Sequence, residues 1–157
     1  MRRTIKLPVN RSNAAMLIRM LYASTAVGPI TTTVTGTILR SAQAFNADNG
    51  ITGVLCQGQG VYLQVLEGKP DAVSALYARI TADKRHKNLQ QLSSEDVTGR
   101  RYGAWAMAHV DLTDADSLLA LRNSDALFET YPSTGERVMA HIDVLIAAGK
   151  VMGTPVV

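Results

Sequence analysis

The sequence predicts an α+β domain in which helices pack against a mixed β-sheet. Segments patterned as strands and segments with helical spacing alternate along the chain in the order β-α-β-β-α-β-β-α-α. Hydrophobic residues make up 46% of the chain and charged residues 18%, which excludes a disordered or coiled-coil polymer. A length of 157 residues favours one domain that buries its own core.

The first half of the chain predicts a strand, a helix and a hairpin. Residues 16–24 form a short apolar run typical of a buried strand. Residues 30–47 have helical spacing, although the threonines at the start of this segment disfavour helix in its first turns. Two apolar runs, 51–57 and 61–67, flank a pair of glycines and predict a hairpin.

The second half predicts one helix, two strands and two closing helices. The first of these helices begins at residues 69–71, with proline in its first turn. Residues 88–97 predict a polar strand, and residues 104–112 predict a stronger one with alternating side chains. The closing helices follow Thr113 and the capping-box pattern at Ser133. The apolar stripes of the three helices are Val73, Leu76, Tyr77 and Ile80; Leu118, Leu119, Leu121 and Ala126; and Val138, Ile142, Leu145 and Ile146.

Positive charge is concentrated at one end of the chain. Residues 1–47 contain six basic residues and no acidic one, whereas the rest carries ten basic and thirteen acidic residues. Basicity is therefore a property of one end of the chain and says little about the partner of the fold itself. The basic end is too short and mixed to indicate a nucleic-acid-binding arm, so we expect no nucleic-acid partner. We expect residues 1–15 to form a solvated basic tail, and a transit peptide is the alternative. No apolar run approaches the ~20 residues that span a bilayer. The single cysteine, Cys56, excludes a disulfide framework and favours a reducing compartment, the cytoplasm.

The sequence lacks the motifs of the common enzyme classes. It contains no dinucleotide-binding glycine motif, phosphate-binding loop, paired-cysteine motif, zinc-protease motif or hydrolase nucleophile motif. The three histidines share no metal-ligand spacing, so we predict no metal site. Four acids stand at predicted element ends, where caps and solvated faces explain them: Glu67, Asp71, Asp114 and Asp116.

Three polar side chains lie inside apolar elements. Tyr22 is near the end of the first strand, Gln64 is in the middle of the run 61–66, and Asn46 lies on roughly the same helix face as Ile38. Burying an amide without a partner costs about 1–3 kcal/mol, so Gln64 needs a hydrogen-bonded neighbour. Taken singly, each of these residues is explained by packing, with Gln64 bonded to a backbone group and Tyr22 in the core.

Three other side chains have simpler interpretations. We expect Cys56 to be buried in its strand. Ser24 either bonds near the site of Tyr22 or simply ends the strand, and His109 is interpreted as facing solvent.

Five segments of the chain resemble the BLUF family of flavin-binding blue-light sensors. They lie in family order between Met16 and about Leu112, and the words N-A-x-x-G-I-T-G and F/Y-x-Q-x-L-E-G are highly specific as a pair. The resemblance implies a ferredoxin-like βαββαββ fold with a mixed five-stranded sheet, two flavin-clamping helices and two C-terminal helices. The segments are LYAS at 21–24, FNADNGITG at 45–53, GQGVYLQVLEG at 58–68, VSALYARITADKRH at 73–86 and WAM at 105–107.

The resemblance also implies a division of the chain. A basic tail at 1–15 would precede the flavin-binding domain at 16–112, followed by a helical extension at 113–150 and a tail at 151–157. We expect the apolar stripe of the last helix to cover the sheet face opposite the flavin, and a self-association surface is the alternative.

Carried over onto this sequence, the resemblance implies a role for nine residues. Tyr22 and Gln64 would form a photochemical hydrogen-bond switch, with Gln64 between Tyr22 and the flavin ring. Asn46 would hydrogen-bond the polar edge of the ring. Trp105 and Met107 would lie on the last strand, where neighbours of the glutamine exchange and pass on the signal. The remaining cofactor contacts would come from Ile38 and Ile80, which sandwich the ring, and from Arg85 and His86, which supply donors near its carbonyl edge and the ribityl-phosphate region.

Two features depart from the family pattern. Phe45 replaces the polar or histidine residue often found beside the asparagine, which puts one ring contact in doubt. The threonine-rich start of the first helix is also unlike the acidic, leucine-rich version usual in the family.

The function implied by the resemblance is blue-light reception with FAD, and FMN and riboflavin are the alternative flavins. Light would move an electron and then a proton from Tyr22 toward the flavin through Gln64. The pair would then recombine, leaving the glutamine rotated or tautomerised and the flavin carbonyl more strongly hydrogen-bonded. No substrate is turned over, so we predict a photoreceptor and not an enzyme. The signal would pass through the last strand and the C-terminal helices to a separate signalling protein, and we expect a homo-oligomer.

Two other classes are weaker alternatives. A flavin-free ferredoxin-like module that binds protein or nucleic acid is disfavoured because the strands lack paired aromatics for base stacking. A flavin enzyme is disfavoured because no substrate-facing acid–base pair is evident.

Overall fold

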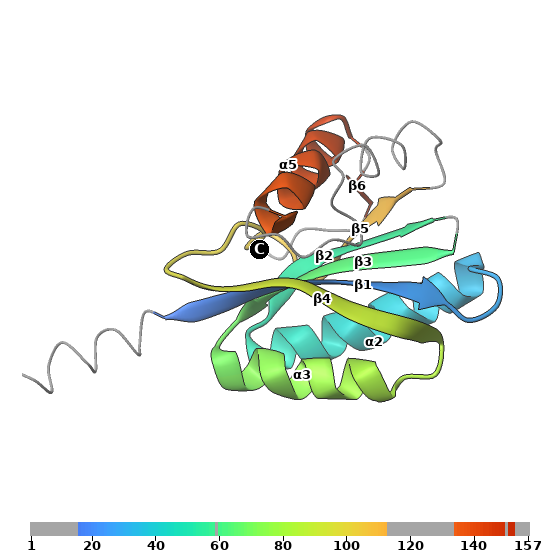
Figure 1. The fold of residues 1–157 in the computed structure, drawn as a ribbon, viewed down its shortest axis with the longest axis horizontal. Helices are drawn as coiled ribbons and strands as arrows, with labels where there is room; N and C mark the ends of the chain where they lie inside the picture. The colour runs from blue at the N-terminus through green and yellow to red at the C-terminus, as the bar shows by residue number, and fades with distance from the viewer. Residues whose placement is uncertain (1–15, 59, 113–133, 150, 153–157) are drawn as a thin grey trace, which may run out of the picture.

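The computed structural model describes residues 16–58, 60–112, 134–149 and 151–152, and confirms the α+β prediction. The strands form one sheet in the order β4-β1-β3-β2-β5-β6, with α2 and α3 on one face and α5 on the other (Figure 1). The elements are β1 (Leu17–Ala26), α2 (Thr32–Asn49), β2 (Thr52–Gly58), β3 (Val61–Gly68), α3 (Pro70–Ala82), β4 (His86–Val97), β5 (Ala108–Asp111), α5 (Thr134–Ala147) and β6 (Val151–Met152).

The sheet is mixed because β2 and β5 run parallel, whereas the other neighbouring strands are antiparallel. Strands β1 to β5 match the predicted five-stranded arrangement. A short sixth strand, β6, pairs with β5 opposite His109 and Val110, so the segment expected as a C-terminal tail begins inside the sheet.

Helix α2 includes the threonine-rich turns that the sequence disfavours. Thr31 is the N-cap, and its side-chain oxygen accepts a hydrogen bond from the backbone N–H of Val34 at 3.1 Å. This bond satisfies one of the amides that a helix start leaves without a partner. The helix ends at Asn49 and is capped by Gly50, whose φ of 66° lies in the left-handed region that glycine adopts without strain. Well-formed caps therefore offset the poor propensity of the first turns.

The last predicted strand is shorter than expected. Strand β5 covers only Ala108–Asp111, so Trp105 and Met107 precede it and do not lie on a strand. The backbone N–H of Gly53 donates to the carbonyl of Trp105 (3.1 Å), and the side chain of Gln43 donates to that of Met107 (3.2 Å). These carbonyls are thus satisfied outside a regular strand ladder, which removes the need to extend β5.

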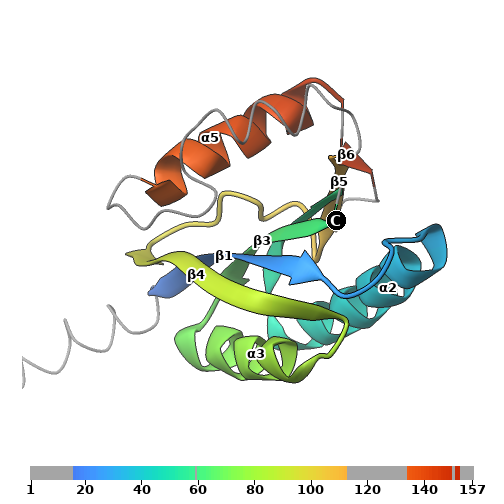
Figure 2. The same cartoon turned by 45° about the vertical axis from the view of Figure 1, so that its right-hand side comes forward.

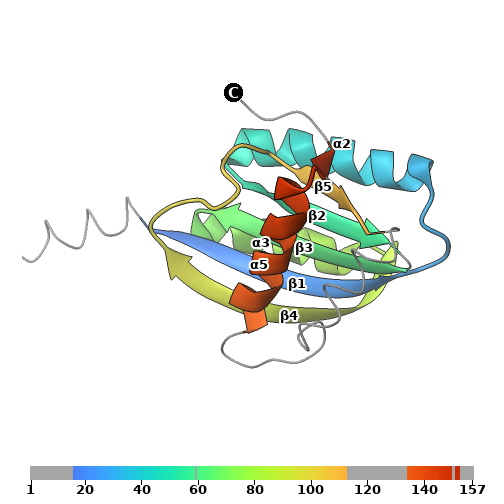
Figure 3. The same ribbon diagram turned by 90° about the horizontal axis from the view of Figure 1, so that it is seen from above.

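Two apolar clusters cover the two faces of the sheet. Val73 and Leu76 of α3 belong to the cluster on the α2–α3 face, and Val138 and Ile142 of α5 belong to the cluster on the opposite face. The predicted stripes of both helices are therefore confirmed as packing faces. Figure 2 shows α5 on the side of the sheet opposite α2 and α3, and Figure 3 shows it lying across the strands.

Two expected segments lie outside the described residues: the basic tail at 1–15 and the helix after Thr113, within 113–133. None of the helices in the described ranges is long and apolar enough to span a membrane. The same ranges contain no group of three or more His, Cys, Asp or Glu side chains that could hold a metal ion.

Candidate functional site

An open cavity lies between α2, α3 and the strands next to them. Its residues combine apolar side chains of the two helices with a few polar and charged ones, the lining that is common for small-molecule sites. Six of the nine predicted site residues line this cavity: Tyr22, Ile38, Gln64, Ile80, Arg85 and His86. The other three, Asn46, Trp105 and Met107, are not among its lining residues.

Tyr22 and Gln64 form a buried pair at the sheet wall of this cavity. The antiparallel register of β1 and β3 places them directly opposite one another. The Tyr22 hydroxyl donates to Gln64 Oε1, and Gln64 Nε2 points to the sulfur of Met107 at 3.4 Å. Burial raises the pKa of Tyr22, with smaller contributions from Tyr77 and Asp83, so the phenol keeps its proton. Gln64 therefore has the neighbour that the sequence requires, and that neighbour is Tyr22.

Asn46 lies beside the cavity and holds the segment before β5. Its side chain is fully buried, and Nδ2 donates to the carbonyl of Ala106 at 2.7 Å. Its Oδ1 has no hydrogen-bond partner among the described residues. A buried acceptor left open in this way is unfavourable unless a ligand or water provides a donor. A ring N–H is one donor that would satisfy this oxygen.

Arg85 and Asp83 form an ion pair among the cavity residues. Arg85 Nε lies 3.0 Å from Asp83 Oδ1, and its Nη2 also bonds to this carboxylate. Hydrogen bonding to Arg85 lowers the pKa of Asp83, and Asp83 in turn raises the pKa of Arg85. The Arg85 side chain is 42% exposed, so the pair is solvent-accessible and well placed to exchange partners.

His86 is held by the protein through both ring nitrogens. Its Nε2 lies 2.7 Å from the carbonyl of Ile80, which can only accept, so Nε2 carries a hydrogen. Its Nδ1 lies 2.8 Å from the hydroxyl of Ser24. This contact supports the interpretation in which Ser24 forms a hydrogen bond near the site of Tyr22 and does not merely end the strand. Because both nitrogens are engaged, His86 contributes a positioned ring to the cavity wall.

Arg79 and Phe45 form a part of the cavity wall that sequence reasoning missed. The Arg79 guanidinium carbon lies 4.3 Å from the centre of the Phe45 ring, a cation–π contact. Both residues line the cavity, one from α3 and one from α2. The unusual Phe45 thus has a partner across the cavity, which no local sequence signal reveals.

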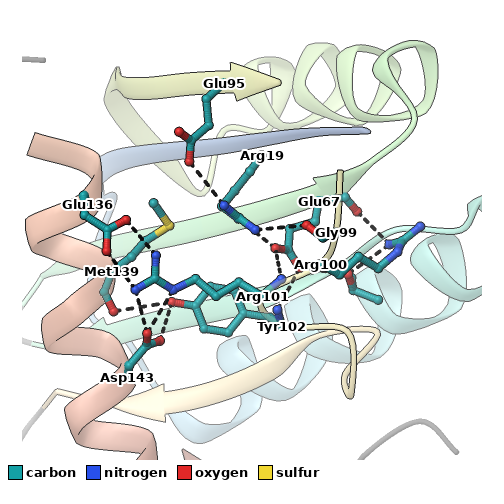
Figure 4. A network of polar contacts seen from close by, with 11 residues as sticks. Arg19, Glu67, Glu95, Gly99, Arg100, Arg101, Tyr102, Glu136, Met139 and Asp143 are labelled. Atoms are coloured by element: carbon teal, nitrogen blue, oxygen red, sulfur yellow. Dashed lines mark hydrogen bonds and ion pairs between the residues drawn. The ribbon is translucent and has the colours of Figure 1, made fainter. Parts of the chain in front are cut away.

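Glu67 was misinterpreted as a solvated acid at the end of its strand. Its side chain is fully buried, and Oε2 accepts from Arg19 Nε (2.8 Å) and from the backbone N–H of Arg101 (2.6 Å). Oε1 accepts from the backbone N–H of Tyr102 (2.9 Å) and from the hydroxyl of Thr52 (3.1 Å). Figure 4 shows this carboxylate at the centre of a polar network that continues to α5. The signal available in the sequence was the strand alternation, since Glu67 shares a face with the buried Val65.

His109 does not face solvent, contrary to our interpretation. It is buried, and its Nε2 lies 3.1 Å from Gln57 Nε2 on the neighbouring strand. Burial lowers the pKa of His109, opposed in part by Asp111. Cys56, by contrast, is buried in β2 as predicted, and burial raises the pKa of its thiol.

Comparison with known proteins identifies the family. The model of the BLUF family, sensors of blue light using FAD, matches residues 17–108. The solved dark-state structure of BlrB, a BLUF protein, is 27% identical with a TM-score of 0.69 and covers 86% of this chain and 98% of its own. A bacterial light-regulated adenylyl cyclase is 29% identical with a TM-score of 0.63, over 83% of this chain and 36% of that one. The chain therefore belongs to the BLUF family of flavin-binding blue-light sensors.

Curated relatives are much longer than this chain. The photoactivated adenylate cyclase subunit alpha of Euglena gracilis is 35% identical over 136 residues, which are 78% of this chain and 13% of the relative. The subunit beta of Euglena longa is 32% identical over 104 residues, or 64% of this chain and 12% of the relative. The similarity thus covers a small part of each cyclase.

Proposed function

We propose that this chain is a blue-light photoreceptor in which Tyr22 and Gln64 convert light absorption into a new pattern of hydrogen bonds. The observation that carries the proposal is the buried Tyr22–Gln64–Met107 chain at the wall of the cavity. Phenols give up an electron and a proton readily, and an amide both donates and accepts hydrogen bonds. These are the two chemical capacities that such a switch needs.

The cavity residues fit a flavin ring. Ile38 of α2 and Ile80 of α3 line the cavity and supply apolar contacts from two helices. Asn46 is not a lining residue, but it follows the lining residue Phe45, and its unpartnered Oδ1 would accept a hydrogen bond from a ring N–H. Arg85 supplies charged donors for flavin oxygens, and His86 orients the wall next to them. We propose FAD as the cofactor, in line with the family description, and FMN and riboflavin are the alternatives.

A bound flavin supplies the absorption of blue light and an acceptor for an electron and a proton. Tyr22 is the donor, because its hydroxyl is protonated and already bonded to Gln64. Gln64 relays the proton, and the electron and the proton then return to Tyr22, so that the only lasting change is a rotated or tautomerised Gln64 whose Nε2 faces a different partner. Met107 is the first residue to register that change, since its sulfur is the present partner of Nε2.

The proposed output is a protein–protein signal. The change at Met107 reaches the segment between β4 and β5, which contacts α5 through Arg101 and Tyr102. Some relatives are named as cyclases, and we propose that this chain instead acts on a separate signalling protein or on its own assembly, without turning over a substrate. The buried single cysteine supports a reducing, cytoplasmic setting.

An absorption spectrum tests the proposal. The purified chain is expected to be yellow, and blue illumination is expected to shift the flavin band reversibly to longer wavelength. A colourless protein that takes up no added flavin would favour the flavin-free binding module. A bound flavin that is bleached by added substrates but never red-shifted would favour a flavin enzyme.

A further inference from the structure

Trp105 and Met107 lie on opposite sides of the sheet although they are two residues apart. Met107 is buried in the cluster of the α2–α3 face, together with Tyr22 and Leu55. Trp105 packs against the cluster of the α5 face. In a regular strand, residues two apart point to the same face. The backbone between them must therefore depart from strand geometry, and it does, since β5 begins only at Ala108.

Two amides of α2 hold this departure in place. Gln43 Nε2 donates to the carbonyl of Met107 at 3.2 Å, and Asn46 Nδ2 donates to the carbonyl of Ala106 at 2.7 Å. Because Gln43 and Asn46 are three residues apart, they project from the same face of the helix. Each amide occupies a carbonyl that a continued strand would use in its ladder.

We propose that Gln43 is a positioning residue of the switch, which holds the Met107 sulfur against Gln64. The contact between Gln64 Nε2 and this sulfur is 3.4 Å long, and a thioether is a weak acceptor. Such a weak contact does little to hold the sulfur in place, so its position depends on the packing of Met107 and on the backbone that carries it. Gln43 fixes that backbone at Met107 itself, whereas Asn46 holds it one residue earlier.

The role of Gln43 in the light rests on the proposed function, whereas its role in the dark does not. The arrangement in the dark is a property of this chain's own residues. Loss of the Gln43 donor is expected to release the Met107 carbonyl and to loosen its sulfur from Gln64. The Tyr22–Gln64 bond involves neither group and is expected to remain.

The test uses flavin-loaded protein with 13C-labelled methionine methyl groups. The chain has six methionines, and the signal of Met107 is the one missing in Met107→Leu. Gln43→Leu removes the donor, and Gln43→Lys restores an N–H donor on a long stem. Thr37→Ala is the matched control, because it removes an exposed side-chain hydrogen bond to Thr33 on the same helix. Gln43→Glu has the same size without a donor and replaces Gln43→Leu if that variant does not fold.

In the dark, Gln43→Leu is expected to move or broaden the Met107 methyl signal, while Gln43→Lys and Thr37→Ala match the wild type. In the light, Gln43→Leu is expected to keep the red shift but to change its rate of dark recovery by about threefold or more, the effect of one hydrogen bond. A Met107 signal that is unchanged in Gln43→Leu, or changed as much in Gln43→Lys, would overturn the assignment. A wild type without a red shift would refute the proposed function and leave the comparison in the dark valid.

Discussion

Tyr22 and Gln64 meet because of backbone register and not because of local sequence. They are 42 residues apart, and the antiparallel pairing of β1 with β3 sets them side by side on one face. A slip of one residue would turn one of the two side chains to the opposite face of the sheet. Leu21 and Val65, the next pair in the register, are fully buried on the other face and oppose such a slip.

Arg85 is the residue whose loss is expected to weaken flavin binding without stopping the switch. It lines the cavity, and its side-chain hydrogen bonds among the described residues are to Asp83 and not to Tyr22 or Gln64. Arg85→Ala is expected to raise the dissociation constant for flavin about tenfold, since a charged hydrogen bond contributes roughly 1.5 kcal/mol or more. Titration of the flavin-free protein followed by flavin fluorescence measures this.

The exposed neighbour Lys84 offers the control for that measurement. Lys84→Ala removes the same charge one residue away and is expected to bind flavin as the wild type does. Equal affinity for flavin in Arg85→Ala and Lys84→Ala would show that Arg85 does not contact the flavin and only pairs with Asp83 at the surface.

Among the elements, those with regular periodicity were predictable from the sequence. The apolar stripe of α3 and the apolar run of β3 indicate from local sequence which side chains are buried, and the structure confirms both. The segment with Trp105 and Met107 alternates like a strand, but side chains of α2 bind its carbonyls. Contacts of that kind join residues 60 or more positions apart, so the local spacing of side chains does not indicate them. The pairing of Phe45 with Arg79 was hidden for the same reason.

Glu67 joins β3 to the segment between β4 and β5, and its carboxylate is expected to be essential for stability. Each carboxylate oxygen of Glu67 accepts from one backbone N–H, so Glu67→Gln places an NH2 group opposite one of these two donors, and it weakens the buried ion pair with Arg19. We expect a loss of about 3–5 kcal/mol in the free energy of unfolding. Urea denaturation followed by circular dichroism measures it.

Glu95 provides a matched control, because it also pairs with Arg19 but is 50% exposed. Glu95→Gln is expected to change the stability by no more than about 1 kcal/mol. Similar losses of stability in the two variants would show that the buried network around Glu67 stabilises the fold no more than the exposed ion pair does.

His109 is expected to make the pairing of β2 and β5 sensitive to acid. Burial lowers its pKa in the folded chain below the ordinary value of about 6.5. The unfolded chain then binds more protons than the folded one as the pH falls through about 6.5, so stability decreases on acidification. His109→Gln is expected to flatten the part of the profile between about pH 7 and pH 5, as measured by urea midpoints. His141→Gln is the control and is expected to leave the profile as in the wild type. If the slope of stability against pH is unchanged in His109→Gln, the acid sensitivity belongs to other groups.

At the scale of the whole molecule, α2 and α3, which line the cavity, lie on the face of the sheet opposite α5 (Figure 2), and the segment between β4 and β5 contacts both sides. Arg101 bonds to Glu136 at 2.9 Å and to Asp143 of α5, and the same segment ends at Met107 beside Gln64. A bias of about 1–3 kcal/mol on such a segment is enough to change the affinity for a partner severalfold.

Met107→Ala is expected to uncouple the two faces. Flavin binding and the red shift should persist, because Tyr22 and Gln64 are unchanged, but the change that light causes in α5 should fall by at least about half. Hydrogen exchange of residues 134–147 in the dark and in the light measures this. Equal light-induced changes in wild type and variant would remove Met107 from the route.

The central claim is that the amide of Gln64 is the switch, and a light-minus-dark absorption spectrum of Gln64→Leu tests it most directly. Leucine keeps the bulk of the side chain but neither donates nor accepts, so flavin should remain bound while the reversible red shift disappears. Gln91→Leu is the control, since Gln91 is exposed on β4 opposite Tyr22. It is expected to switch like the wild type. A reversible red shift of normal size in Gln64→Leu would contradict the account.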